Sequence, residues 1–224
     1  MTKQTNYTPP AGYSALTPLY DIGVRLTTRE IKWRKALVGF ITPNDDDVLL
    51  DVGAGTGSLA PLMAQANPAI TYLGIDPDEH AIEIARAKAQ RAGIDVEFKR
   101  AMMSADAVAD WPTPNIVTLC LVLHQVPLDE KMRLLNEIHS VLAPGGRLFV
   151  ADYAEQTSWL MRKLFRATVQ QLDGITDTQP NADGVLIPLM SRTGFAGVRE
   201  LRKFNTVTGS ISIISAMKRA EEPS

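Results

Sequence analysis

The stretch VLLDVGAGTGSLA, residues 48–60, decides the fold of this chain of 224 residues. An apolar run that only Asp51 interrupts is followed by glycines at alternate positions, Gly53, Gly55 and Gly57. The run is typical of a buried parallel strand. A helical pattern begins after the glycines, and a glycine-rich turn between a strand and a helix usually holds a nucleotide-like ligand.

Strand-like and helix-like segments alternate on both sides of this turn. Further strands are predicted at residues 69–76, 95–100, 115–123 and 147–153, and helices at residues 58–66, 77–93 and 128–146. This alternation indicates right-handed βαβ crossovers and a parallel sheet. Ligands of such sheets lie beyond the carboxyl ends of the strands, where we therefore expect the functional residues.

The two ends of the chain differ from the alternating core. Residues 15–41 carry apolar residues at helical spacing, which predicts one or two helices before the sheet. Beyond the last core strand we predict helices at residues 158–174 and 184–195 and strands at residues 196–204 and 209–218. Because no helix separates these two strands, they are expected to form an antiparallel hairpin at the edge of the sheet.

Composition places the chain among ordinary globular proteins. The formal net charge of -2 provides no global attraction to nucleic acid or to an anionic membrane. The single cysteine, Cys120, excludes an internal disulfide and fits a reducing compartment. The first residues lack the apolar core of a secretory signal, and no stretch reaches the ~18 apolar residues of a membrane span. We expect a cytoplasmic protein without a nucleic-acid partner.

The glycine loop differs from the two common phosphate-binding loops. In the dinucleotide motif G-x-G-x-x-G that starts at Gly53, the third glycine would stand at position 58, which is Ser58. A Walker loop needs a lysine that is absent here. Asp51 is unfavourable for a phosphate and favours a ligand with positive charge. S-adenosylmethionine (SAM) fits, because it carries an ammonium, a carboxylate and a sulfonium and no phosphate.

A second acid supports a nucleoside ligand. Asp76 ends the predicted strand 69–76, at the distance from the loop where an acid accepts both hydroxyls of a ribose. Asp76 alone does not separate SAM from NAD, whereas Asp51 and the glycine spacing do. The structural alternative is a plain strand–turn–helix in which Asp76 caps the helix.

Four ordered motifs resemble those of class I SAM-dependent methyltransferases. These are VLLDVGAGTGSLA, YLGIDPDEHAIEIARAKA, NIVTLCLVLHQVP and LNEIHSVLAPGGRLFVADY. The resemblance implies an α/β, Rossmann-like fold, with a seven-stranded, mostly parallel sheet, helices on both faces and an antiparallel C-terminal hairpin. It implies one methyltransferase domain, divided into an N-terminal helical lid segment (1–45), a SAM-binding core (46–153) and substrate-side helices with the hairpin (154–224).

The resemblance also implies the cofactor contacts. Asp51, Gly53, Gly55 and Gly57 fall at the methionyl end of SAM, Asp76 takes the ribose hydroxyls, Pro77 lies beside it, and Leu121 ends the fourth strand close to the ligand.

The stretch after the third strand departs from the family pattern, since Ala101 and Met102 stand where many relatives carry an acid that contacts adenine. Met102 or Met103 is a candidate to pack on the adenine, unless both fill the core, and Asp106 is a candidate for the acid. Residues 16–37 are similar to the leader of quinone-biosynthesis C-methyltransferases, which makes Tyr20 a candidate lid residue or a structural helix start.

Methyl transfer from a sulfonium needs alignment and exclusion of water, and a base only where the nucleophile arrives protonated. His124, which follows the fourth strand, is the catalytic candidate, because its usual pKa lies near neutral pH. The alternative is a histidine that holds a neighbouring loop. Asp152 and Tyr153 are candidates to orient substrate or to cap the next helix, and no residues have the spacing of a metal site.

Residues 158–171 mix aromatic, apolar and basic side chains in a helical pattern. Such a helix can make transient contact with a membrane surface, or it packs on its own domain with solvated charges. We expect methyl transfer to a small hydrophobic acceptor, such as a quinone precursor or a lipid-like molecule. The alternatives are a non-catalytic SAM-binding regulator and, less favoured, an NAD-dependent oxidoreductase.

Overall fold

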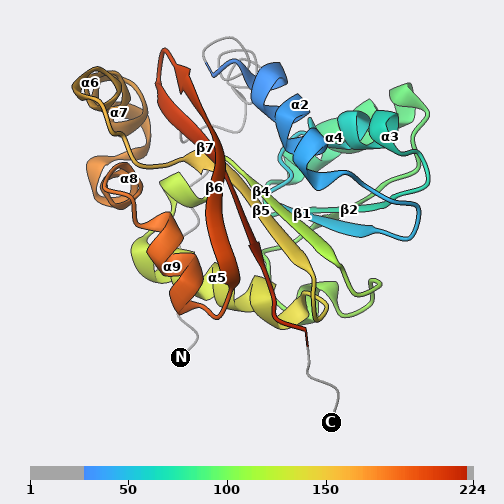
Figure 1. Ribbon diagram of the computed structural model, residues 1–224. Helices are drawn as coiled ribbons and strands as arrows, with labels where there is room; N and C mark the ends of the chain where they lie inside the picture. The colour runs from blue at the N-terminus through green and yellow to red at the C-terminus, as the bar shows by residue number, and fades with distance from the viewer. Residues whose placement is uncertain (1–27, 221–224) are drawn as a thin grey trace, which may run out of the picture.

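A seven-stranded sheet forms the centre of the computed structural model, which describes residues 28–220 (Figure 1). The strands are β1 (Val48–Val52), β2 (Thr71–Asp76), β3 (Glu97–Arg100), β4 (Ile116–Cys120), β5 (Arg147–Tyr153), β6 (Ala196–Thr206) and β7 (Gly209–Met217). Their order across the sheet is β3-β2-β1-β4-β5-β7-β6. The first five strands pair in parallel, and β7 is antiparallel to both β5 and β6. The predicted sheet with its antiparallel C-terminal hairpin is confirmed.

Helices cover both faces of this sheet. One face carries α2 (Glu30–Ile41), α3 (Ala60–Ala66) and α4 (Glu79–Ala92), and the other carries α5 (Leu128–Val141) and α9 (Leu186–Arg192). The strands supply both cores because successive side chains point to opposite faces. In β1, Leu49 packs in the first core and Leu50 in the second. Two short 3-10 turns, η3 (Asp106–Val108) and η4 (Leu123–Gln125), complete the core region.

Three further helices, α6 (Trp159–Ala167), α7 (Val169–Asp173) and α8 (Ile175–Ala182), gather to one side of the β6–β7 hairpin (Figure 1). The prediction of one helix over residues 158–174 is therefore wrong. The chain breaks at Thr168, with φ −121° and ψ −82°, and the Thr168 hydroxyl donates to the carbonyl of Leu164 at 2.7 Å. Hydroxyl side chains that bond to the backbone in this way compete with the helix.

The fourth strand is shorter than predicted. It ends at Cys120 instead of residue 123, because Leu121 adopts a left-handed φ of 58°. The chain then turns out of the sheet, and the backbone N–H groups of Val122 and Leu123 donate to the Asp152 carboxylate instead of a neighbouring strand. This turn places the following residues above the sheet edge.

Of the predicted N-terminal helices, the structure describes α2, which packs Trp33, Leu37 and Ile41 fully into the core. Residues 1–27 of the predicted lid lie outside the described residues. Between residues 28 and 220, no helix is long and apolar enough to cross a membrane. The division into lid, core and substrate-side parts stays a prediction.

Candidate cofactor and acceptor site

The carboxyl ends of β2, β1, β4 and β5 lie side by side at one edge of the sheet. The loops that follow these strands bring together most of the residues predicted for the site. In an open sheet of this kind, the strand order changes direction between β1 and β4, and the ligand crevice lies at that point. The geometry of the loops there determines what they can bind.

The glycine loop after β1 contains a close backbone approach and an open position. The N–H groups of Gly53 and Ala54 donate to the carbonyl of Ile75 at 2.8 and 3.1 Å, which ties the loop to β2. Gly53 has φ 71°, and a Cβ there would stand 2.4 Å from a methyl of Val122. Gly55 has φ 54° and faces open space, since an added Cβ would meet nothing within 4 Å. At Gly55 the loop therefore exposes its backbone to open space.

The carboxylate of Asp76, at the end of β2, is hydrogen-bonded to the glycine loop at Gly55. Its Oδ2 accepts from the Gly55 N–H at 2.8 Å, and its Oδ1 accepts from the Asp78 N–H at 2.9 Å. Burial raises the pKa of Asp76 to about 6, although the two N–H donors oppose this shift. The helix cap is Asp78, which accepts from the N–H groups of His80 and Ala81. The structural alternative that assigned the cap to Asp76 is therefore wrong.

Asp51, which the resemblance assigns to the methionyl end of the cofactor, is buried within β1, the strand that leads into the glycine loop. It is 1% exposed and points to the face covered by α2. Its carboxylate accepts from the Tyr72 hydroxyl at 2.5 Å and from the Thr118 hydroxyl at 2.7 Å, and burial raises its pKa. The alternation of side chains along β1 explains this position, because residue 51 shares its face with Leu49. A contact of Asp51 with the cofactor ammonium stays a prediction.

The turn after β4 is held by the carboxylate of Asp152, which is fully buried. Asp152 accepts from the N–H groups of Val122, Leu123 and Tyr153 at 3.0, 2.6 and 2.7 Å. Leu121, at the start of this turn, combines a bulky side chain with positive φ, a strained conformation that clusters at functional sites. The predicted alternative that Asp152 caps the next helix is wrong, because Ser158 caps α6. Asp152 instead holds the turn after β4, and its role in orienting substrate stays a prediction.

His124 is buried between two carboxylates. Its Nδ1 lies 2.7 Å from Asp152 Oδ1, and its Nε2 lies 3.5 Å from Asp173 Oδ2 on α7. Burial alone would lower the pKa of His124, but the two carboxylates raise it to about 9. At neutral pH the imidazolium therefore has no free lone pair to take a proton. This geometry favours the loop-holding alternative, and the role of His124 as a base stays a prediction.

A buried lysine, missed by the sequence analysis, joins the same region. The Lys131 ammonium of α5 donates to the carbonyl of Val126 at 2.5 Å and to that of Asp177 on α8 at 2.8 Å. Burial lowers the pKa of Lys131 to about 8. The available signal was its helical spacing, since Lys131 shares a face with the buried Leu135 and Ile138.

The remaining predicted positions are spread around the crevice. Pro77 lies between Asp76 and the α4 cap, and Met102 is 45% exposed, so it is open to a ligand, whereas Met103 is buried in the second core. Tyr20 lies outside the described residues. Within residues 28–220, no group of three or more His, Cys, Asp or Glu side chains could hold a metal ion.

Comparisons with known proteins agree with this geometry. A methyltransferase domain family matches residues 49–146. The chain is 30% identical over 166 residues to a demethylmenaquinone methyltransferase of Thermus thermophilus, which covers 71% of this chain and 72% of that protein. It is 28% identical over 204 residues to a ubiquinone/menaquinone biosynthesis C-methyltransferase of Rubrivivax gelatinosus, with 87% of this chain and 78% of that protein covered.

A solved structure shares the fold. The magnesium protoporphyrin IX methyltransferase of Synechocystis PCC 6803, with bound SAH, matches with a TM-score of 0.62 and 19% identity. The match covers 84% of this chain and 82% of that chain.

Proposed function

The chain belongs to the family of SAM-dependent methyltransferases, and from this premise we propose that its methyl acceptor is a small hydrophobic molecule, such as a quinone precursor or a lipid-like compound. The support comes from the two relatives named for quinone biosynthesis, which resemble most of the chain. The atom that accepts the methyl group is left open, because the similar proteins include both C-methyltransferases and O-methyltransferases by name.

The observation that carries the cofactor assignment is the open position at Gly55, whose N–H donates to the Asp76 carboxylate. Bare backbone at Gly55 suits close approach of the methionyl and ribose parts, and no side chain of the described residues fills the space beside it. We propose that Asp76 accepts the ribose hydroxyls and that Gly53, Gly57, Pro77, Met102 and Leu121 line the rest of the pocket. When bound, SAM supplies a methyl group already activated by the sulfonium.

The chain's own contribution to catalysis is alignment and exclusion of water. The turn after β4, fixed by Asp152 and His124, forms one wall of the crevice between the cofactor loop and the acceptor-side helices. Because both ring nitrogens of His124 face carboxylates, which raise its pKa, we propose that it positions this wall; to act as a base it would first have to lose a proton.

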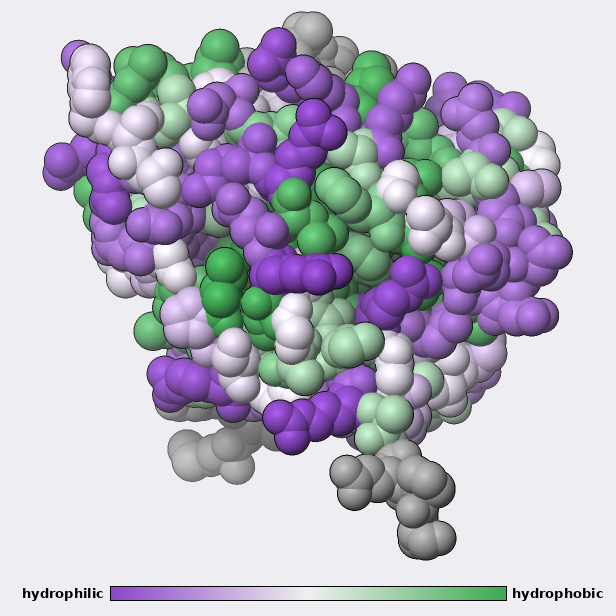
Figure 2. All heavy atoms as spheres, viewed as in Figure 1, coloured by the Kyte–Doolittle hydropathy of each residue, from purple (hydrophilic) through white to green (hydrophobic). Residues whose placement is uncertain are grey.

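We further propose transient contact with a membrane surface through residues 158–171. Trp159 and Leu160 are 74% and 46% exposed, and the basic residues Lys163 and Arg166 lie on the same helix, α6. Figure 2 shows hydrophobic side chains among hydrophilic ones over this part of the molecule, at the upper left. Vesicles of anionic lipid should sediment the wild type and leave the double variant Trp159→Ser/Leu160→Ser in solution, whereas Val207→Ser, on another exposed turn, should behave as wild type. The proposed cytoplasmic location is tested by cell fractionation.

The experiment that tests the function is calorimetric titration of the purified protein with SAM, S-adenosylhomocysteine and NAD. We expect the first two to bind and NAD not to bind. Binding of NAD alone would overturn the cofactor assignment in favour of the oxidoreductase alternative. Turnover with quinone precursors then separates an enzyme from a SAM-binding regulator, since a regulator binds SAM without forming methylated product.

A further inference from the structure

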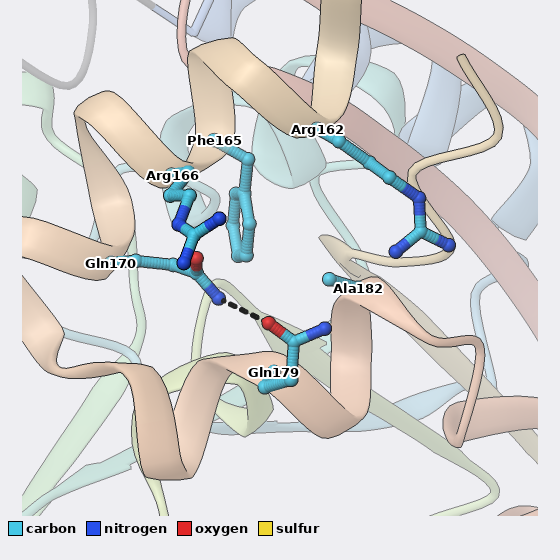
Figure 3. Close-up of a pocket in the computed structure, with 6 residues that line it drawn as sticks. All are labelled: Arg162, Phe165, Arg166, Gln170, Gln179 and Ala182. Atoms are coloured by element: carbon cyan, nitrogen blue, oxygen red, sulfur yellow. Dashed lines mark hydrogen bonds between the residues drawn. The ribbon is translucent and has the colours of Figure 1, made fainter. Parts of the chain in front are cut away.

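A small cavity lies among α6, α7 and α8, apart from the residues assigned to the cofactor (Figure 3). Its lining consists of Arg162, Phe165, Arg166, Gln170, Gln179 and Ala182. Its volume is about 160 Å³, below the about 300–1,000 Å³ of pockets for drug-sized ligands, so the cavity can hold only a small molecule. None of the six lining residues is acidic, and two of them are cations.

One of the two cations is neutralised by its neighbours. Arg162 Nη1 donates to Asp183 Oδ1 at 3.0 Å, so its charge is compensated at the rim. The second carboxylate oxygen of Asp183 accepts from Gln179 Nε2 at 2.9 Å, and Gln179 Oε1 accepts from Gln170 Nε2 at 3.0 Å. This chain of hydrogen bonds fixes both glutamine amides in place.

The other cation, Arg166, is solvent-exposed at the edge of the cavity and forms no ion pair with the other described residues. None of the ion pairs found between residues 28 and 220 involves its guanidinium, which shares the cavity with Phe165 and the buried amide of Gln170. Figure 3 shows the side chains of Arg166, Gln170 and Gln179 pointing toward one another, with the Phe165 ring beside them. The cavity thus carries one unpaired positive charge next to an aromatic wall.

The cavity lies on the acceptor side of the fold. The Phe165 ring is 5.2 Å from the ring of Tyr153, the last residue of β5, and the Tyr153 ring is 5.1 Å from that of His124. Asp173, on the same short helix as Gln170, reaches His124 at 3.5 Å. The packed rings of Phe165 and Tyr153 therefore connect one wall of the cavity to the end of β5, and a molecule bound against Phe165 would lie next to the acceptor side.

We propose that this cavity binds the carboxylate of a small aromatic acid, with Arg166 as the partner of the carboxylate and Phe165 packed against the ring. The inference rests on the proposed small-molecule acceptor and specifies its chemical class. A guanidinium matches a carboxylate with two parallel N–H donors. A single unpaired cation neutralises the one negative charge of a carboxylate. It neutralises only part of the nearly two negative charges of a phosphate monoester.

The test is a titration of the full-length protein with sodium benzoate, benzamide and phenyl phosphate, followed by NMR through the side-chain amide signals of Gln170 and Gln179. We expect benzoate to shift these signals and benzamide, which lacks the charge, to bind at least about tenfold more weakly, since charge-assisted hydrogen bonds are the strong ones. Benzamide binding as well as benzoate, or phenyl phosphate binding more tightly than benzoate, would overturn the carboxylate assignment.

Variants of α6 locate the binding. Arg166→Gln should weaken benzoate binding about tenfold or more. Arg166→Lys should recover part of the loss, because lysine restores the positive charge but lacks the two parallel N–H donors of a guanidinium. Lys163→Gln, which removes the same charge from the same exposed helix outside the cavity, should bind benzoate as the wild type does. An equal loss in Lys163→Gln, or no loss in Arg166→Gln, would show that the cavity does not recognise the acid.

Titration with S-adenosylhomocysteine in the same samples separates this inference from the proposed function. If the nucleoside binds and benzoate does not, the acid site is wrong and the cofactor assignment is unaffected. If benzoate binds through Arg166 and the nucleoside does not, the acid site stands and the cofactor assignment is wrong. Thermal unfolding of each variant verifies that it is folded.

Discussion

Both sides of the crevice use a carboxylate that accepts from backbone N–H groups, Asp76 and Asp152, but only the acceptor side adds buried cations. On the cofactor side, backbone N–H groups of Gly55 and Asp78 donate to one carboxylate, that of Asp76. On the acceptor side, buried cations connect elements that are distant in sequence, since His124 reaches Asp173 on α7 and Lys131 reaches Asp177 on α8.

This difference has a consequence for pH and for mutation. Backbone donors keep their protons at any ordinary pH, so the cofactor loop keeps its shape and only Asp76 titrates. The buried cations change charge between neutral and alkaline pH, and each also pairs with buried oxygen atoms of other elements. A change of pH or a mutation at the buried cations should therefore lower the folding stability of the protein. The same kind of change at Asp76 should lower only the affinity for the cofactor.

The largest effect should come from breaking the cofactor side. We expect Asp76→Ala to weaken SAM binding about a hundredfold or more, because two charge-assisted hydrogen bonds of about 1.5 kcal/mol each are lost. Calorimetry measures this loss, and Glu79→Ala, a neighbouring acid exposed on α4, is the control. An affinity equal to that of the wild type would place the pocket elsewhere.

The acceptor side should respond to pH through His124. Its folded pKa of about 9 exceeds the unfolded value of about 6.5, so its stabilisation is complete below pH 6.5 and declines as the pH rises toward 9. We expect the free energy of unfolding to fall by about 1.6 kcal/mol between pH 6.5 and 8 through His124. Lys131, whose pKa is about 8, is half deprotonated at the upper pH and offsets a small part of this fall.

Urea unfolding at the two pH values measures this slope. His124→Gln should remove it, whereas His80→Gln, at an exposed position of α4, should retain it. A slope that survives in His124→Gln would assign the pH dependence to another group.

Lys131→Met should destabilise the protein by about 2 kcal/mol at neutral pH. The substitution leaves the carbonyl groups of Val126 and Asp177 buried without their donor, at about 1–3 kcal/mol each, and removal of the buried charge offsets part of this cost. Unfolding curves measure the loss, and Lys32→Met on the exposed face of α2 is the control. A stability unchanged from the wild type would mean that α8 is not held through this lysine.

The smallest effect concerns pH and cofactor affinity. Because the pKa of Asp76 is about 6, the free protein holds a proton there at lower pH that must leave before the carboxylate accepts both ribose hydroxyls. We expect SAM affinity to fall up to about tenfold between pH 7 and 5. Calorimetry at both values tests this, and Asp76→Asn, which does not titrate, should give weak binding without the pH dependence.

The sequence was most informative where neighbours along the chain make the structure. The glycine loop, the helix closed by Gly93 and the antiparallel hairpin were predicted with small errors at their ends, because turn residues and hydrophobic periodicity act locally. It was least informative on the acceptor side. The break at Thr168 and the helix α8, which contains Pro180, were not predicted, since Pro180 argues against a helix by local rules.

By itself, the sequence determined the alternating core, the loop at residues 53–57 and the position of Asp76 at the end of the next strand. These features depend on residue types and their spacing. Only the tertiary structure decided that Asp51 turns under α2, that His124 is held between Asp152 and Asp173, and that Lys131 is buried. Those positions depend on which elements pack together across the sheet. Contacts between residues far apart in the chain set charge and burial there, and no local pattern encodes them.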